Sequence, residues 1–159
     1  MGDDPDRCYR AALRILNHRF NSTAELKRKL RAKGFSSDAI DPTLERLAAE
    51  KWLDDARFAG AYVRTRVQRR IGKIRIRREL IRAGVPDDLI AQAVGENVEP
   101  ESEHARALAA AQKRLPALMR RYEPAVARNK LAAYLLNQGY DAALVREVIK
   151  ETRGLSPRA

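Results

Sequence analysis

Hydrophobic and polar residues recur three times along the chain in the same frame. In each copy, two apolar residues four positions apart precede a glycine, and a further apolar residue follows it. The copies are Leu26, Leu30, Gly34 and Phe35; Ile76, Leu80, Gly84 and Val85; and Leu131, Leu135, Gly139 and Tyr140. Apolar residues at i and i+4 share one face of a helix, and glycine is the usual left-handed residue after a helix end. Each copy therefore predicts a helix that stops at its glycine.

A second helix is predicted after each glycine. Residues typical of helix starts follow at once, namely Ser36 or Ser37 before Asp38, Pro86-Asp87-Asp88, and Asp141. Apolar pairs then recur at matched places, which are Ile40 and Leu44, Ile90 and Val94, and Val145 and Ile149. Many unrelated helices also end in a glycine, but agreement at six positions, the glycine and five apolar residues, in three copies favours a true repeat.

The distance between the glycines leaves room for a third helix in each repeat, because two-helix repeats span only about 33–47 residues. A repeat that cannot bury its own apolar stripe must stack on its neighbour. We therefore predict an all-α fold of three tandem three-helix repeats that form an elongated curved array. The predicted repeats are residues 6–53, 54–98 and 101–153, with flexible termini at residues 1–5 and 154–159.

Several helix boundaries can be predicted from local signals. Ser22 and Glu25 form a capping-box pattern, and Asp54 or Asp55 is a typical cap for the helix that follows. Pro116 is expected to end a helix of residues 101–114, with a short turn leading to Pro124. Inward positions are expected for Phe58 and Tyr62 on one helix, and for Ile76, Leu80 and Ile81 on the next.

The charge balance indicates which class of partner the protein binds. The 159 residues contain 32 Lys plus Arg against 21 Asp plus Glu, a net charge of +11. Such an excess favours polyanions, most often nucleic acid, over an anionic membrane surface. All three repeats are basic, which fits a long contact surface. A single cysteine excludes an internal disulfide, and no apolar run reaches the ~20 residues of a membrane span. We expect no signal peptide. We expect a cytoplasmic protein without membrane contact.

The densest cationic stretch runs from Arg64 to Arg82 and contains one acid, Glu79. A charge run is often only a solvated helix face. Here arginine predominates and acidic partners at i±4 are nearly absent, which favours binding of an external anion. Arg75, Arg78 and Arg82 are expected to share an outer stripe. In the first repeat Lys27 and Arg28 align with Arg77 and Arg78, whereas the third has Ala132 and Ala133 there.

Catalytic and metal-binding patterns are weak. His18 and His104 lie in different repeats, and Cys8 has no evident base partner. Asp54-Asp55 is better explained as a helix cap than as a metal-binding pair, and no glycine-rich phosphate loop is present. We predict no catalytic residue, no cofactor and no metal. Aromatics are scarce, and the core positions expected for Phe35, Phe58 and Tyr62 argue against a base-stacking platform.

Three longer motifs carry a family resemblance. They are Trp52-Leu53-Asp54-Asp55-Ala56-Arg57-Phe58-Ala59, Ile76-Arg77-Arg78-Glu79-Leu80 with Gly84, and Ser22-Thr23-Ala24-Glu25-Leu26-Lys27-Arg28-Lys29-Leu30 with Gly34. Together with the repeat pattern they resemble the RecX family of RecA regulators over about residues 8–153. One departure concerns the entry to the fifth helix, where the family's usual Gly-Tyr-Gly-Pro is Arg70-Ile71-Gly72-Lys73.

The resemblance implies three tandem three-helix repeats and a non-enzymatic regulator. It implies binding to the RecA recombinase and its filament on single-stranded DNA, with suppression of ATP hydrolysis, coprotease activity and strand exchange. Our hypothesis is that nine cationic residues bind the acidic recombinase surface and DNA phosphates, without reading bases. These residues are Lys27, Arg28, Arg64, Arg70, Lys73, Arg75, Arg77, Arg78 and Arg82. We expect a monomer.

Two other classes of function remain open on the sequence. A free-standing helical DNA-binding protein of helix-turn-helix type would bind a duplex site without recombinase, with a steep dependence on salt. A helical scaffold or adaptor would bind neither recombinase nor DNA.

Overall fold

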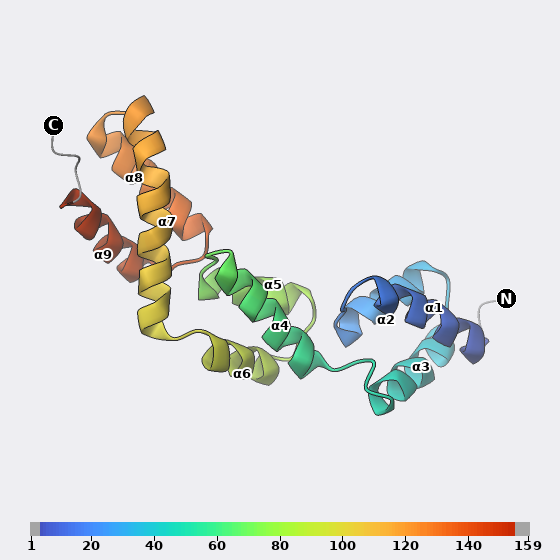
Figure 1. Cartoon of the computed structure of the whole chain (residues 1–159). Helices are drawn as coiled ribbons and strands as arrows, with labels where there is room; N and C mark the ends of the chain where they lie inside the picture. The colour runs from blue at the N-terminus through green and yellow to red at the C-terminus, as the bar shows by residue number, and fades with distance from the viewer. Residues whose placement is uncertain (1–3, 155–159) are drawn as a thin grey trace. The chain divides into compact units, whose positions relative to one another are not determined.

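The computed structural model describes residues 4–154, and within them it contains nine α-helices and no strand (Figure 1). The helices are α1 (Pro5–His18), α2 (Thr23–Ala32), α3 (Ser37–Ala49), α4 (Asp55–Gln68), α5 (Lys73–Arg82), α6 (Asp87–Asn97), α7 (Pro100–Arg121), α8 (Pro124–Asn137) and α9 (Ala142–Arg153). The all-α prediction is confirmed. Of the termini expected to be flexible, residues 1–3 and 155–159 lie outside the described part. Pro5 is already helical, because Asp4 caps α1.

The chain divides into two compact units. The first comprises the chain up to Ala61 with Leu80–Ala93, and the second comprises Tyr62–Glu79 with the chain from Val94 onward. In the first unit α1, α2 and α3 each contact the other two, and Leu26, Leu30, Ile40 and Leu47 are fully buried. In the second unit α7, α8 and α9 contact one another in the same way, around the buried residues Leu131, Leu135, Tyr140 and Val148.

The helix starts follow the predicted caps. Ser22 Oγ accepts a hydrogen bond from the Glu25 amide at 3.1 Å, and the Ser22 N–H donates to the Glu25 carboxylate at 3.3 Å. Asp54 Oδ1 accepts from the Arg57 amide at 3.0 Å, and Asp141 Oδ1 accepts from the Leu144 amide at 2.9 Å. These side chains satisfy amides that the first turn of a helix leaves without a partner.

The three repeat glycines all have left-handed backbone, with φ of 89° at Gly34, 75° at Gly84 and 97° at Gly139. In each copy the next residue donates its N–H to the carbonyl five positions earlier, at 3.2–3.3 Å. This bond folds Phe35, Val85 and Tyr140 back into the core, where all three are buried. The predicted helix stop is confirmed at each glycine.

Two of these glycine ends receive the start of another helix. In the first unit, the Ser22 hydroxyl at the start of α2 donates to the carbonyl of Ala83, at the end of α5. In the second unit, the start of α5 rests on the end of α8. There Gly72 N–H donates to the Gln138 carbonyl at 2.8 Å, and Ile74 N–H donates to the Gly139 carbonyl at 3.1 Å. We call these two contacts the glycine joints.

The glycine joints explain why two of the glycines need to be small. A β-carbon added to Gly84 would collide with the β-carbon of Ala24, and one added to Gly139 would collide with the backbone of Arg75. Around Gly34 no atom lies within 4 Å of the same position. The three glycines therefore share a conformation but differ in their surroundings.

Two sequence predictions about helices were wrong. α7 does not end before Pro116 but continues to Arg121. A proline removes only one backbone donor, and Leu115 and Leu118 on either side of it pack against the core of the second unit, which holds the helix together. Ile81 is 59% exposed instead of inward, because the apolar stripe of α5 passes through Ile76 and Leu80.

Substitution of the glycines should separate backbone strain from steric collision. We expect Gly34→Ala to lower the free energy of unfolding by about 1 kcal/mol, the cost of left-handed backbone in a residue with a β-carbon. Gly139→Ala should lose a further ~1–3 kcal/mol, because its β-carbon meets the Arg75 backbone. Urea unfolding followed by circular dichroism measures both. Equal losses in the two variants would contradict the glycine joint at Gly139.

Candidate nucleic-acid and partner interface

The nine candidate cations are divided between the two units. Lys27, Arg28 and Arg82 belong to the first unit, and the other six belong to the second. The structure also divides them by environment. Three of the nine have partners inside the protein, and six point their charge outward.

The three cations with partners are Lys27, Lys73 and Arg75. Lys27 Nζ lies 2.8 Å from Asp41 Oδ1 in a solvent-exposed pair of small energetic weight. Arg75 donates from Nε to Glu79 Oε1 at 3.1 Å and from Nη1 to Gln138 Oε1 at 3.1 Å. Arg75 is half-buried, so it does not share an outer stripe with Arg78 and Arg82 as predicted.

Glu79 explains why Arg75 is not on the outer stripe, because its carboxylate accepts hydrogen bonds from several donors. Besides Arg75, it accepts from Arg66 Nε at 2.9 Å and from the Tyr62 hydroxyl at 2.9 Å. Burial raises the pKa of Tyr62, and the hydrogen bond from Tyr62 to Glu79 raises it further. Tyr62 is half-buried, so it is a polar link between α4 and α5 and not the core residue that the sequence led us to expect. The expectation that the arginine charge is not used inside the protein was wrong for Arg66 and Arg75.

A buried carboxylate closes the start of α5. Glu103, on α7, is only 3% exposed, and its Oε1 accepts from the Lys73 amide at 2.8 Å. Lys73 Nζ lies 3.6 Å from the other oxygen of Glu103. Position 73 is where the resemblance led us to expect proline, which has no N–H to donate. The lysine here supplies both a backbone donor and a charge for Glu103.

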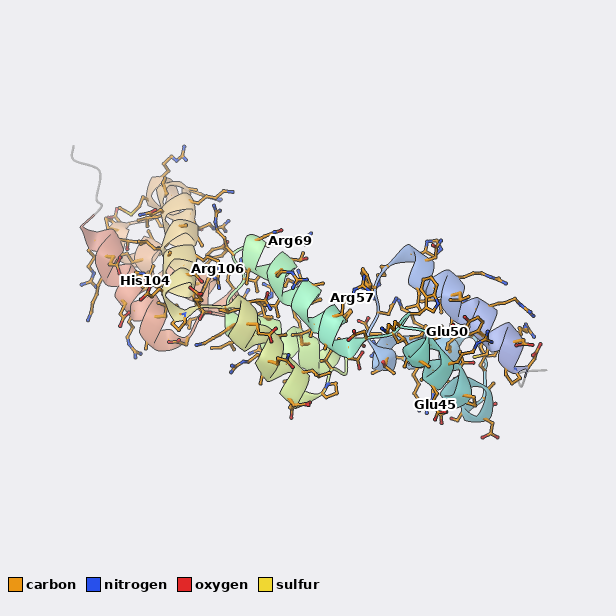
Figure 2. All side chains as sticks on the ribbon, turned by 60° about the horizontal axis from the view of Figure 1, so that its bottom comes forward. Glu45, Glu50, Arg57, Arg69, His104 and Arg106 are labelled. Atoms are coloured by element: carbon orange, nitrogen blue, oxygen red, sulfur yellow. The ribbon has the colours of Figure 1, made fainter. Side chains whose placement is uncertain are left out.

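The six outward cations are Arg28, Arg64, Arg70, Arg77, Arg78 and Arg82. All are exposed, and within residues 4–154 none of their side chains forms an ion pair or a hydrogen bond. Arg69, just after α4 and outside the predicted set, is equally exposed (Figure 2). The charge of these side chains is therefore available to an external anion.

The aromatic side chains only partly follow the sequence prediction. Phe35 and Phe58 are buried as expected. Phe20 and Trp52, however, are each 58% exposed and line a hollow of about 320 Å³ in the first unit. Arg57, labelled in Figure 2, lies over the Phe20 ring at 5.0 Å. Phe20 follows the end of α1, and Trp52 follows left-handed Lys51, so the helical period gave no signal for either.

Residues 4–154 contain neither a metal-site grouping nor a helix that could span a membrane. No three His, Cys, Asp or Glu side chains in this range are grouped as a metal site would require. None of the helices described is both long and apolar enough to cross a membrane. Cys8 is fully buried in the core of the first unit. Asp55, considered above as a possible ligand, instead accepts from the Thr23 amide at 2.8 Å.

Comparison with known proteins places the chain in a family. Models of the first, second and third three-helix domains of RecX match residues 8–47, 54–94 and 101–149. The chain belongs to the RecX family. Proteins described as regulatory protein RecX are 34% identical in Prosthecochloris aestuarii and 33% identical in Chlorobium phaeobacteroides. The first alignment covers 93% of this chain and 95% of the relative, and the second covers 95% and 97%.

Solved RecX structures agree with the fold. The crystal structure of RecX from Lactobacillus salivarius superposes with a TM-score of 0.80, covering 95% of this chain and 97% of that one. A second crystal structure, of a regulatory protein RecX, gives 0.83 and covers 92% and 73%. Both are 24% identical in sequence and support the fold alone. The prediction of three tandem three-helix repeats is confirmed.

Two arginines of the same helix should differ in their contribution to stability. We expect Arg75→Ala to lower the free energy of unfolding by about 1 kcal/mol, since it removes hydrogen bonds to Glu79 and Gln138 at a half-exposed position. Arg78→Ala, which loses no internal contact, should stay within about 0.5 kcal/mol of the wild type. Chemical denaturation measures both. A larger loss for Arg78→Ala would contradict this division of the cations.

Tyr140 makes the stability of the fold depend on pH in the alkaline range. It is 1% exposed, and its hydroxyl donates to the Arg70 carbonyl at 2.6 Å. Burial raises the pKa of Tyr140 to about 12, although the nearby charge of Arg106 opposes the shift. Because the pKa of Tyr140 in the folded protein lies above its ordinary value of 10.0, the contribution of Tyr140 to stability is complete below pH 10. It is lost as the pH rises toward 12.

Tyr140→Phe should therefore remove part of the alkaline destabilisation. At neutral pH the variant should be about 1 kcal/mol less stable, because the hydrogen bond to Arg70 is lost. Between pH 10 and 12 the stability deficit of the variant should shrink and then reverse, because a pKa raised from 10.0 to about 12 outweighs the loss of one hydrogen bond. Thermal melts at a series of pH values measure this difference. A deficit of the variant that grows with pH would contradict the assignment.

Proposed function

We propose that this protein is a non-enzymatic regulator of the RecA recombinase. It binds RecA and the RecA filament on single-stranded DNA, and it suppresses ATP hydrolysis, coprotease activity and strand exchange. It acts as a cytoplasmic monomer without cofactor or metal. Membership of the RecX family supports this function, since the relatives are described as regulatory proteins.

The observation that carries the proposal is the set of outward arginines without internal partners. Arg77 and Arg78 lie side by side in the sequence of α5, and Arg64 lies on α4 of the same unit. A guanidinium binds carboxylate or phosphate through two parallel hydrogen bonds, so these side chains suit both an acidic protein surface and a DNA backbone. Contacts of this kind do not read bases, which fits a regulator that acts on filaments of any sequence.

Because the three-helix unit is repeated, contacts made by different repeats can add to the affinity for one filament. We take residues 6–53, 54–98 and 101–153 as the three repeats of the proposed regulator. If contacts from different repeats bind neighbouring protomers of one filament, the second contact is intramolecular and affinity rises without any new interaction. A clamp of this kind restrains the relative movement of protomers that hydrolysis and strand exchange require. Lys27, Arg28 and Arg82 would supply such contacts from the first unit.

Charge reversal at two outward positions should abolish regulation. We expect Arg77→Glu with Arg78→Glu to reduce inhibition of the ATPase of RecA filaments on single-stranded DNA at least tenfold, because attraction to the anion becomes repulsion. Neither side chain has a partner among residues 4–154, so the helical content should not change. Steady-state ATP hydrolysis is measured against regulator concentration, at a salt concentration where the regulator does not coat the DNA.

A matched control carries the same charge change elsewhere. Arg146→Glu with Lys150→Glu reverses two exposed cations on α9 and should retain inhibition within about twofold. An equal loss of inhibition in the two variants would show that only the net charge of the protein matters, and it would overturn the role of Arg77 and Arg78. If the wild type leaves RecA unaffected but binds duplex DNA tightly, the function is that of a free-standing DNA-binding protein.

A further inference from the structure

The third repeat contains a groove that no candidate residue occupies. It lies between the second half of α7 and α8, both in the second unit, and forms an open hollow of about 970 Å³. Its α7 wall consists of the segment after Arg114, which includes the turns beyond Pro116 that the sequence led us to expect as a loop. The groove therefore depends on the continuation of α7 through this proline.

The charge of the groove has one sign. Arg114 and Arg121 line it from α7 and Lys130 lines it from α8, whereas no acidic residue is among the lining side chains. All three cations are exposed, and within the described chain none of them forms an ion pair. A concave surface with uncompensated positive charge concentrates anions more strongly than a flat one.

Two tyrosines add flat apolar surface beside these cations. Lys130 Nζ lies 4.6 Å from the centre of the Tyr122 ring, and the Arg114 guanidinium lies 4.9 Å from that of Tyr134. Tyr122 remains 36% exposed despite this contact. Ala133 also lines the groove, and its small side chain leaves room next to the rings. Cations that follow a backbone and rings that stack on bases are the two elements of single-strand binding.

We propose that this groove binds single-stranded nucleic acid, with phosphates at Arg114, Arg121 and Lys130 and a base stacked on Tyr122. An acidic polypeptide would use the cations but would leave the exposed tyrosine without a partner. A duplex keeps its bases stacked on one another, so it too cannot use the ring. This inference rests on the proposed function, because it names the place where the proposed regulator binds the single strand. Its test needs no recombinase.

Photocrosslinking locates the strand directly. The probe is a short oligothymidylate with one thymine replaced by 5-iodouracil, which forms crosslinks to aromatic side chains it stacks on. After irradiation, the crosslinked peptide is identified by mass spectrometry. We expect it to contain Tyr122 or Tyr134. Crosslinks confined to peptides outside residues 114–137, for example at Phe20 or Trp52, would overturn the proposal.

Affinity variants separate stacking from charge. Tyr122→Leu keeps an apolar side chain at an exposed position, and we expect oligothymidylate affinity to fall about 5-fold to 100-fold by fluorescence anisotropy. Tyr122→Phe should restore binding, because the ring is retained. An abasic oligonucleotide of the same length should bind both variants equally. If Tyr122→Leu binds oligothymidylate as tightly as the wild type, no base stacks at this site and the proposal fails.

The cations have a matched control on another helix. Log affinity falls as log salt rises, and Arg121→Gln with Lys130→Gln should make this fall less steep by about 1.4. This is the value for two lost phosphate contacts with a single strand. Arg146→Gln with Lys150→Gln, an equal charge change on α9, should leave the slope unchanged. Equal changes in both pairs, or binding of polyglutamate in preference to oligothymidylate, would overturn the proposal. ATPase inhibition that persists when oligonucleotide binding is lost leaves the proposed function intact.

Discussion

The backbone groups at helix ends control how this fold is assembled. A helix leaves its first amides and last carbonyls without internal partners, and buried groups of this kind must find partners elsewhere. In each glycine joint, a carbonyl at the end of one helix accepts a hydrogen bond from the start of another. The positive end of one helix dipole thus meets the negative end of the next. Glycine is needed there for both its backbone and its lack of a side chain.

The glycine joint of the second unit also explains why the cations of α5 have different environments. Lys73 and Arg75 stand at the glycine joint of the second unit, so their charge is directed to Glu103, Glu79 and Gln138. The arginines further along α5 have no role in the joint and remain exposed. One helix therefore serves packing at its start and recognition along its outer face. A charge run in a repeat protein cannot be assigned to one role as a whole.

The sequence predicted those features that depend on neighbours along the chain. The left-handed glycines, the Ser22–Glu25 capping box and the caps at Asp54 and Asp141 are all local patterns, and all are present. The continuation of α7 past Pro116 was missed, because it depends on the packing of Leu115 and Leu118 against the core of the second unit. The partners of Glu103 were missed for the same reason, since Lys73 lies 30 positions earlier in the chain.

The long separation of these partners has a consequence for synthesis on the ribosome. Tyr140 donates to the carbonyl of Arg70, and 70 residues separate them. At about 5–20 residues per second, the start of α5 emerges roughly 4–14 s before the residues that complete its hydrogen bonds. During this interval the amides of Gly72 and Ile74 lack the carbonyls of Gln138 and Gly139 that accept from them in the folded protein. The second unit can therefore close only after translation of its last repeat is nearly complete.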